Sequence, residues 1–120
     1  MKHYLIAVVD DDESVLFAVT SLIVSMGFDA EPFGSATALL SADPNRFACI
    51  VTDIQMPAFT GIQLKERLDS LGFAGSVIMI TSRNEPEIQA RALACHPFCL
   101  LQKPFDGDVL QGCLERALEI

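Results

Sequence analysis

The chain has 120 residues, 51% of them hydrophobic, and its 16 acidic and 8 basic side chains give a formal net charge of −8. This length suits one domain with a single core over residues 1–120, and the composition is typical of a globular chain rather than a disordered one. The scattered basic residues argue against direct nucleic-acid binding. Because the longest uncharged stretch, residues 14–28, is shorter than the roughly 20 residues of a membrane span, we expect a soluble protein without a signal peptide or membrane association.

The four cysteines form no Cys-x-x-Cys pair, and two of them lie within apolar periodic runs. A reduced thiol in such a run packs as a small hydrophobic group. Cys95, His96 and Cys99 could supply half of a metal site, but a second pair of ligands is missing, so we expect packing in the core or a loop. Reduced cysteines favour a cytoplasmic location.

Short apolar runs alternate five times with stretches of helical periodicity, a pattern that predicts alternating strands and helices. In chain order, the predicted strand and helix of each cycle are residues 5–9 and 15–26, 30–33 and 35–40, 48–52 and 64–71, 77–81 and 87–94, and 99–102 and 109–118.

Strands separated by helices join one sheet in parallel, through right-handed crossovers. The runs 5–9, 48–52 and 77–81 are almost continuously apolar, as expected of central strands covered on both faces. Pro32 lacks an N–H for a ladder bond, which puts the second strand at one edge and the fifth at the other. The sequence therefore predicts an α/β, doubly wound, flavodoxin-like fold: a five-stranded parallel sheet of order 2-1-3-4-5 with five helices.

The carboxyl ends of these strands carry the residues suited to chemistry. In a doubly wound sheet ligands bind at this edge, and Asp10 and Asp11 follow the first strand, Asp53 the third, Thr81 the fourth and Lys103 the fifth. Close carboxylates repel one another unless a cation is present, and hard oxygens suit Mg²⁺. An aspartate fixed at a strand end suits nucleophilic attack on phosphorus, with Mg²⁺, Lys103 and the Thr81 hydroxyl stabilising the phosphoryl oxygens.

Each of these signals also has a purely structural interpretation. Asp12 and Glu13 are expected mainly to favour the start of the following helix. Thr81 alone is typical of a turn hydroxyl and Lys103 of a solvated loop. Their joint position at the ends of different strands is what favours a site.

Four segments resemble the signatures of response-regulator receiver domains in their order and intervals. They are Val-Val-Asp-Asp-Asp at 8–12, Thr-Asp-Ile-Gln-Met-Pro at 52–57, Ile-Thr-Ser at 80–82 and Lys-Pro-Phe at 103–105. The resemblance runs from about residue 3 to the last helix. Within this family, the chain most resembles the receivers that precede helix-turn-helix domains in transcription regulators of the nitrogen-fixation type.

The resemblance implies a phosphorylation-dependent switch of a two-component system. Asp53 would accept a phosphoryl group from a sensor histidine kinase, and Mg²⁺ would be held by Asp10, Asp11, Asp53 and the backbone carbonyl of Gln55. Lys103 would contact the phosphoryl oxygens and Thr81 would turn toward them. The domain would phosphorylate and dephosphorylate itself rather than turn over external substrates.

The resemblance also implies a cis peptide before Pro104 and several partners. Besides the kinase, these are an output domain outside this chain and a second copy of the chain on phosphorylation.

Some positions depart from the receiver pattern. Leu100 stands where relatives usually carry an aromatic residue that moves with the threonine, and Phe98 starts from a different point on the backbone, so we do not expect it to substitute. The segment around Pro97 replaces a small turn, which predicts a differently shaped output face. Gln55 and Arg83 occupy positions that tune acyl-phosphate lifetime; neither is a general base, so we expect a moderate to long lifetime.

Two alternative functions remain open. A degenerate receiver would bind partners without phosphorylation, and Leu100 and the His96–Pro97 turn favour it. A haloacid-dehalogenase-like phosphatase would use Asp10 as nucleophile and Asp12 as general acid, but it needs a cap and a later acidic pair that this chain does not supply.

Overall fold

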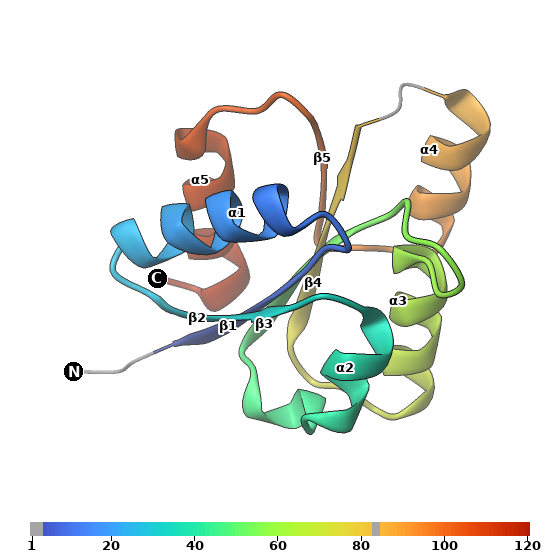
Figure 1. The fold of residues 1–120 in the computed structure, drawn as a ribbon, viewed down its shortest axis with the longest axis horizontal. Coiled ribbons are helices and arrows are strands. Elements are labelled where there is room, and N and C mark those ends of the chain that lie inside the picture. Colours follow the sequence, from blue (N-terminus) through green and yellow to red (C-terminus); the bar gives the residue numbers. More distant parts are fainter. Residues whose placement is uncertain (1–3, 83–84) are drawn as a thin grey trace.

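The computed structural model describes residues 4–82 and 85–120 and places a parallel sheet between two layers of helices (Figure 1). The strands are β1 (Leu5–Val9), β2 (Asp29–Phe33), β3 (Cys49–Asp53), β4 (Ser76–Thr81) and β5 (Cys99–Gln102). The helices are α1 (Glu13–Ser25), α2 (Ala36–Ser41), α3 (Gly61–Ser70), α4 (Pro86–Ala94) and α5 (Gly107–Leu118), with a short 3₁₀ helix, η1 (Pro44–Arg46). The strand order is β2-β1-β3-β4-β5, which confirms the predicted flavodoxin-like fold.

The two faces of the sheet bury separate apolar layers. One layer, under α1 and α5, includes Ile6, Ile23 and Leu114, and the other, under α2, α3 and α4, includes Leu64 and Met79. Every residue of β3 is buried, as expected for a central strand of a parallel sheet. β3 is thereby held from both sides, and its carboxyl end has little freedom to move.

The starts of α1, α2 and α3 are set by side-chain caps rather than by the apolar period. Asp12, Ser35 and Thr60 each accept a backbone N–H bond at the start of α1, α2 and α3. Thr60 and Gln63 form a reciprocal capping box, which satisfies two donors that a helix otherwise leaves unpaired. Apolar spacing predicted α1 and α3 to start two or three residues later, because their first turns carry few apolar side chains.

The edge position predicted for the second strand is confirmed. β2 pairs only with β1 in the described sheet, and Pro32 lies opposite Val8. Within the described residues, no helix has the length and apolar character to cross a membrane.

The start of α3 approaches the end of β3 very closely at Gly61. The Gly61 N–H donates to the carbonyl oxygen of Ile54 at 3.0 Å, and a Cβ at Gly61 would overlap the backbone carbonyl of Asp53. Only a glycine allows this approach without a backbone shift. It closes the loop that follows Asp53.

Replacing Gly61 by alanine is expected to destabilise the domain by about 1 to 3 kcal/mol, since the added methyl must displace backbone. Urea unfolding measures this change. Gly34→Ala is the matched control, because a Cβ there meets no atom within 4 Å, and its effect should stay within about 0.5 kcal/mol. Equal effects of the two substitutions would contradict the close approach.

Candidate functional site

Three carboxylates meet at the carboxyl ends of β1 and β3. The parallel register sets Val9 beside Thr52, so the residues that follow these strands converge. One carboxylate oxygen from each of Asp10, Asp11 and Asp53 lies within 4.8 Å of the others. Asp10 and Asp53 are only 6% and 7% exposed, whereas Asp11 faces solvent. The structure therefore assembles the three predicted acidic residues into one cluster.

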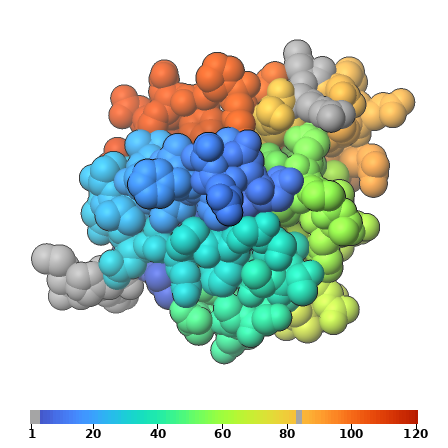
Figure 2. Space-filling view, in the orientation of Figure 1, coloured from blue at the N-terminus to red at the C-terminus, as the bar shows by residue number. Residues whose placement is uncertain are grey.

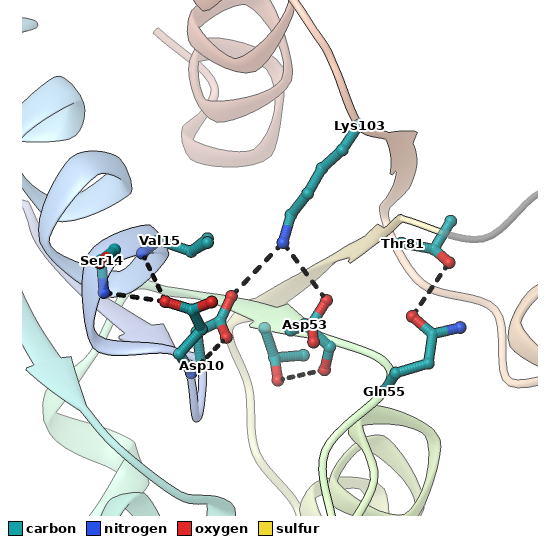
Figure 3. Close-up of polar contacts among 9 residues, drawn as sticks. Asp10, Ser14, Val15, Asp53, Gln55, Thr81 and Lys103 are labelled. Carbon is teal, nitrogen blue, oxygen red and sulfur yellow. Dashed lines mark hydrogen bonds and ion pairs between the residues drawn. The ribbon is translucent and has the colours of Figure 1, made fainter.

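Lys103 extends over this cluster from the end of β5 (Figure 3). Its Nζ lies 3.5 Å from Asp10 Oδ2 and 3.7 Å from Asp53 Oδ1. The backbone N–H of Lys103 donates to the Thr81 carbonyl at 2.8 Å, and the Lys103–Pro104 peptide is cis, as predicted. Lys103 thus bridges the two buried carboxylates and leaves part of their negative charge uncompensated.

The electrostatics of Asp53 show this shortage of positive charge. Burial raises the pKa of Asp53 to about 6; Lys103 opposes the rise, and Asp10 and Asp11 add to it. Within the described residues, the buried Asp53 Oδ1 accepts no hydrogen bond. A desolvated carboxylate oxygen that accepts no hydrogen bond is stabilised by a nearby cation.

These features fit a hard divalent cation. Mg²⁺ prefers carboxylate and carbonyl oxygens and retains water ligands, and an acidic cluster with two buried members and one exposed member offers such a site. Among the described residues, this is the one group of three such side chains close enough to hold a metal. Cys95 and His96 do not belong to it.

Thr81 ends β4 on the other side of Asp53. Its side chain is fully buried, and its hydroxyl donates to the side-chain Oε1 of Gln55 at 3.2 Å. Gln55 Nε2 is buried and, within the described part of the chain, has no acceptor. Sequence reasoning singled out the backbone carbonyl of Gln55 but missed this side-chain contact, which depends on the path of the loop between β3 and α3.

Asp12 lies outside the cluster and caps α1. Its Oδ1 accepts from the backbone N–H groups of Ser14 at 2.9 Å and Val15 at 3.2 Å, as the sequence interpretation expected. A carboxylate engaged in this way is poorly placed to be a general acid. The geometry therefore disfavours the haloacid-dehalogenase-like alternative, which needed Asp12 for that role.

The departures from the receiver pattern lie around β5. Leu100 is partly buried and packs on the layer under α2, α3 and α4, and the Phe98 side chain is 45% exposed. His96 adopts a left-handed conformation with φ of 55°, which turns the chain from α4 into β5. Arg83 falls outside the described residues.

Comparison with known proteins decides the family. A family model for the response regulator receiver domain matches residues 6–115. The chain belongs to this receiver domain family. It is 32% identical over 117 residues to the response regulator protein TodT of Pseudomonas putida, covering 96% of this chain and 51% of that protein. It is 31% identical over 114 residues to the transcriptional regulatory protein FixJ of Bradyrhizobium diazoefficiens, covering 94% and 56%.

Solved structures agree with this assignment. The crystal structure of FixJ-N superposes with a TM-score of 0.91 at 30% identity, covering 99% of this chain and 96% of that one. The response regulator StyR gives a TM-score of 0.88 at 30% identity, covering 98% and 60%. The resemblance to receivers of nitrogen-fixation-type transcription regulators is confirmed, and this receiver domain spans about half the length of the curated relatives it matches.

Without Mg²⁺, Asp53→Asn is expected to stabilise the receiver domain. The pKa of Asp53 is about 6 in the folded chain against an ordinary value of 3.8, so ionised Asp53 costs stability at neutral pH. Two pKa units correspond to at most ~3 kcal/mol, and we expect a gain of about 1 to 3 kcal/mol. Urea unfolding in EDTA at pH 7.5 measures it.

Asp12→Asn serves as the control, because asparagine also caps helices, and it should change stability by less than about 0.5 kcal/mol. Millimolar Mg²⁺ should shrink or reverse the gain for Asp53→Asn. A loss of stability for Asp53→Asn in EDTA would show that the cluster is not short of positive charge.

Proposed function

We propose that this receiver domain accepts a phosphoryl group on Asp53 from a sensor histidine kinase, with Mg²⁺ bound, and thereby controls an output domain or partner. The observation that carries the proposal is the buried Asp53 carboxylate at the end of β3, with Lys103 Nζ 3.7 Å from Oδ1 and two further carboxylates alongside. The parallel sheet fixes all four groups relative to one another.

The reaction would be a displacement at phosphorus. An Asp53 oxygen attacks, a P–O bond forms, and the P–N bond to the kinase histidine breaks, so that the imidazole leaves and takes a proton from solvent. Such a transfer depends on positioning and on stabilising the equatorial oxygens rather than on covalent work by the protein. Lys103 is placed to neutralise one of these oxygens beside Asp53.

Asp10, Asp11, Asp53 and the backbone carbonyl of Gln55 would hold Mg²⁺. When bound, the ion supplies positive charge to the carboxylates and the phosphoryl oxygens. The uncompensated charge around Asp53 supports this role.

The switch would be a shift between two arrangements of the domain. Phosphorylation adds a charge of nearly −2, which would draw Lys103 and the Thr81 hydroxyl toward Asp53 and favour a second arrangement of α4, β5 and α5. Leu93 on α4, Phe98 before β5 and Val109 on α5 expose large apolar side chains. These residues support a phosphorylation-dependent dimer through this face.

Partners are proposed from the exposed surface and the relatives. In the space-filling view α1 occupies the surface between α5 and α2 (Figure 2). The kinase would dock there through Ser14, Val15 and Ala18, together with Pro104 in the loop between β5 and α5. Because the curated relatives are about twice as long as this chain, an output domain would follow in a longer protein. The four free cysteines support a cytoplasmic setting.

A degenerate receiver remains the second candidate. Leu100 in place of the usual aromatic residue favours it. The complete set of Asp10, Asp11, Asp53 and Lys103 favours the phosphorylated switch.

Incubation with Mg²⁺ and phosphoramidate should add one phosphoryl group, about 80 Da, in intact mass spectrometry. The addition should be lost in Asp53→Asn, which lacks the nucleophilic oxygen, and kept in Asp12→Asn, whose position lies outside the cluster. Absence of any adduct in the wild type, together with absence of Mg²⁺ binding, would select the degenerate receiver instead.

Substitutions of the three consecutive aspartates should differ in their effect on Mg²⁺ affinity. Asp10→Asn and Asp11→Asn each remove a carboxylate of the cluster and should weaken binding at least ~10-fold, whereas Asp12→Asn should change it less than about twofold. Isothermal titration calorimetry gives these affinities. Equal losses in all three variants would show that general negative charge, and not a defined set of ligands, attracts the ion.

A further inference from the structure

The Thr81 hydroxyl is already engaged in the structure. It donates to Gln55 Oε1 at 3.2 Å, across 26 residues of sequence, and Thr81 itself is fully buried. Figure 3 shows the Gln55 amide between α3 and the end of β4, turned toward Thr81. The contact therefore joins the loop after the acceptor residue Asp53 to the end of the neighbouring strand.

A threonine hydroxyl has one proton to donate. If Thr81 turns toward a phosphoryl group on Asp53, its hydrogen bond to Gln55 Oε1 must break. Within the described residues, Asp53 Oδ1 accepts no hydrogen bond and Gln55 Nε2 finds no acceptor. In the observed arrangement, the Thr81 hydroxyl therefore donates to Gln55 Oε1 and not to Asp53 Oδ1.

We propose that the Gln55 side chain is a latch, a positioning residue that holds the Thr81 hydroxyl away from Asp53 and so opposes the phosphorylated arrangement. This inference rests on the proposed function, because it needs a phosphoryl group at Asp53 to compete for the same proton. It is separate from the backbone carbonyl of Gln55, which every substitution at this position retains.

The latch is tested with beryllofluoride, a phosphoryl analogue, titrated calorimetrically onto the full chain with millimolar Mg²⁺. Gln55→Met keeps the length of the side chain but removes the acceptor. One neutral hydrogen bond corresponds to about a two- to tenfold change in an equilibrium, so Gln55→Met should tighten beryllofluoride binding by about two- to tenfold. Gln111→Met on α5 is the matched control and should leave the affinity unchanged.

A double-mutant cycle with Thr81→Val isolates the hydrogen bond, since valine keeps the shape of threonine without the hydroxyl. In the Thr81→Val background, Gln55→Met should no longer tighten binding. Equal tightening in both backgrounds would overturn the latch and point to relief of the unpaired Nε2. Weaker binding of Gln55→Met would also overturn it, because Gln55 would then assist the phosphoryl group.

The same cycle in urea unfolding, without beryllofluoride, measures the hydrogen bond directly. The two substitutions should be non-additive by about two- to tenfold in the unfolding equilibrium, and additivity would overturn the latch whatever the phosphorylation chemistry. Failure of the wild type to bind beryllofluoride, with this non-additivity intact, would instead reject the proposed acceptor function and with it the regulatory role of the bond.

Discussion

The burial of Asp53 beside two other carboxylates at one edge of the sheet is the constraint on which the site depends. Asp10 and Asp53 are buried, Asp11 stands beside them, and Lys103 compensates only part of their charge. In water such groups would separate, but here each is fixed by the strand that precedes it. Burial of the Asp53 carboxylate, with a smaller addition from the charges of Asp10 and Asp11, raises its pKa and makes the pocket sensitive to a change of charge at Asp53.

The rest of the fold keeps this arrangement from relaxing. β3 is buried along its whole length, and two apolar layers hold the sheet from both sides. Gly61 lets α3 start against the Asp53 carbonyl, while the Asp12 cap fixes the start of α1 beside Asp10. The apolar layers and the close approach at Gly61 do not depend on the charge of the pocket, and the Asp12 carboxylate is engaged by the α1 backbone rather than by the cluster. A phosphoryl group would therefore act on side chains and the β4 and β5 ends rather than on the sheet.

The side chains able to respond to such a group are Lys103 and Thr81, and they are held differently. Lys103 is attracted by the carboxylates themselves, so it is already near Asp53. Thr81 is held by a neutral hydrogen bond to Gln55, and a bond of this kind contributes little enough to be exchanged for one to a charged oxygen. Leu100 offers neither a ring nor a hydroxyl at its position on β5 and packs on the apolar layer under α2, α3 and α4.

The sequence by itself determined the number and order of strands and helices, the central and edge strands, and the convergence of Asp10, Asp11, Asp53, Thr81 and Lys103. It could do so because apolar periodicity is local and parallel strands end at a common edge. The predicted first residues of α1 and α3 were less accurate, because polar caps and not apolar spacing define where these helices start. Only the tertiary structure decided that Gly61 touches the Asp53 carbonyl and that the Thr81 hydroxyl donates a hydrogen bond to Gln55 Oε1. Those contacts depend on how the loop after β3 runs past the end of β4, a path set by packing between residues distant in sequence.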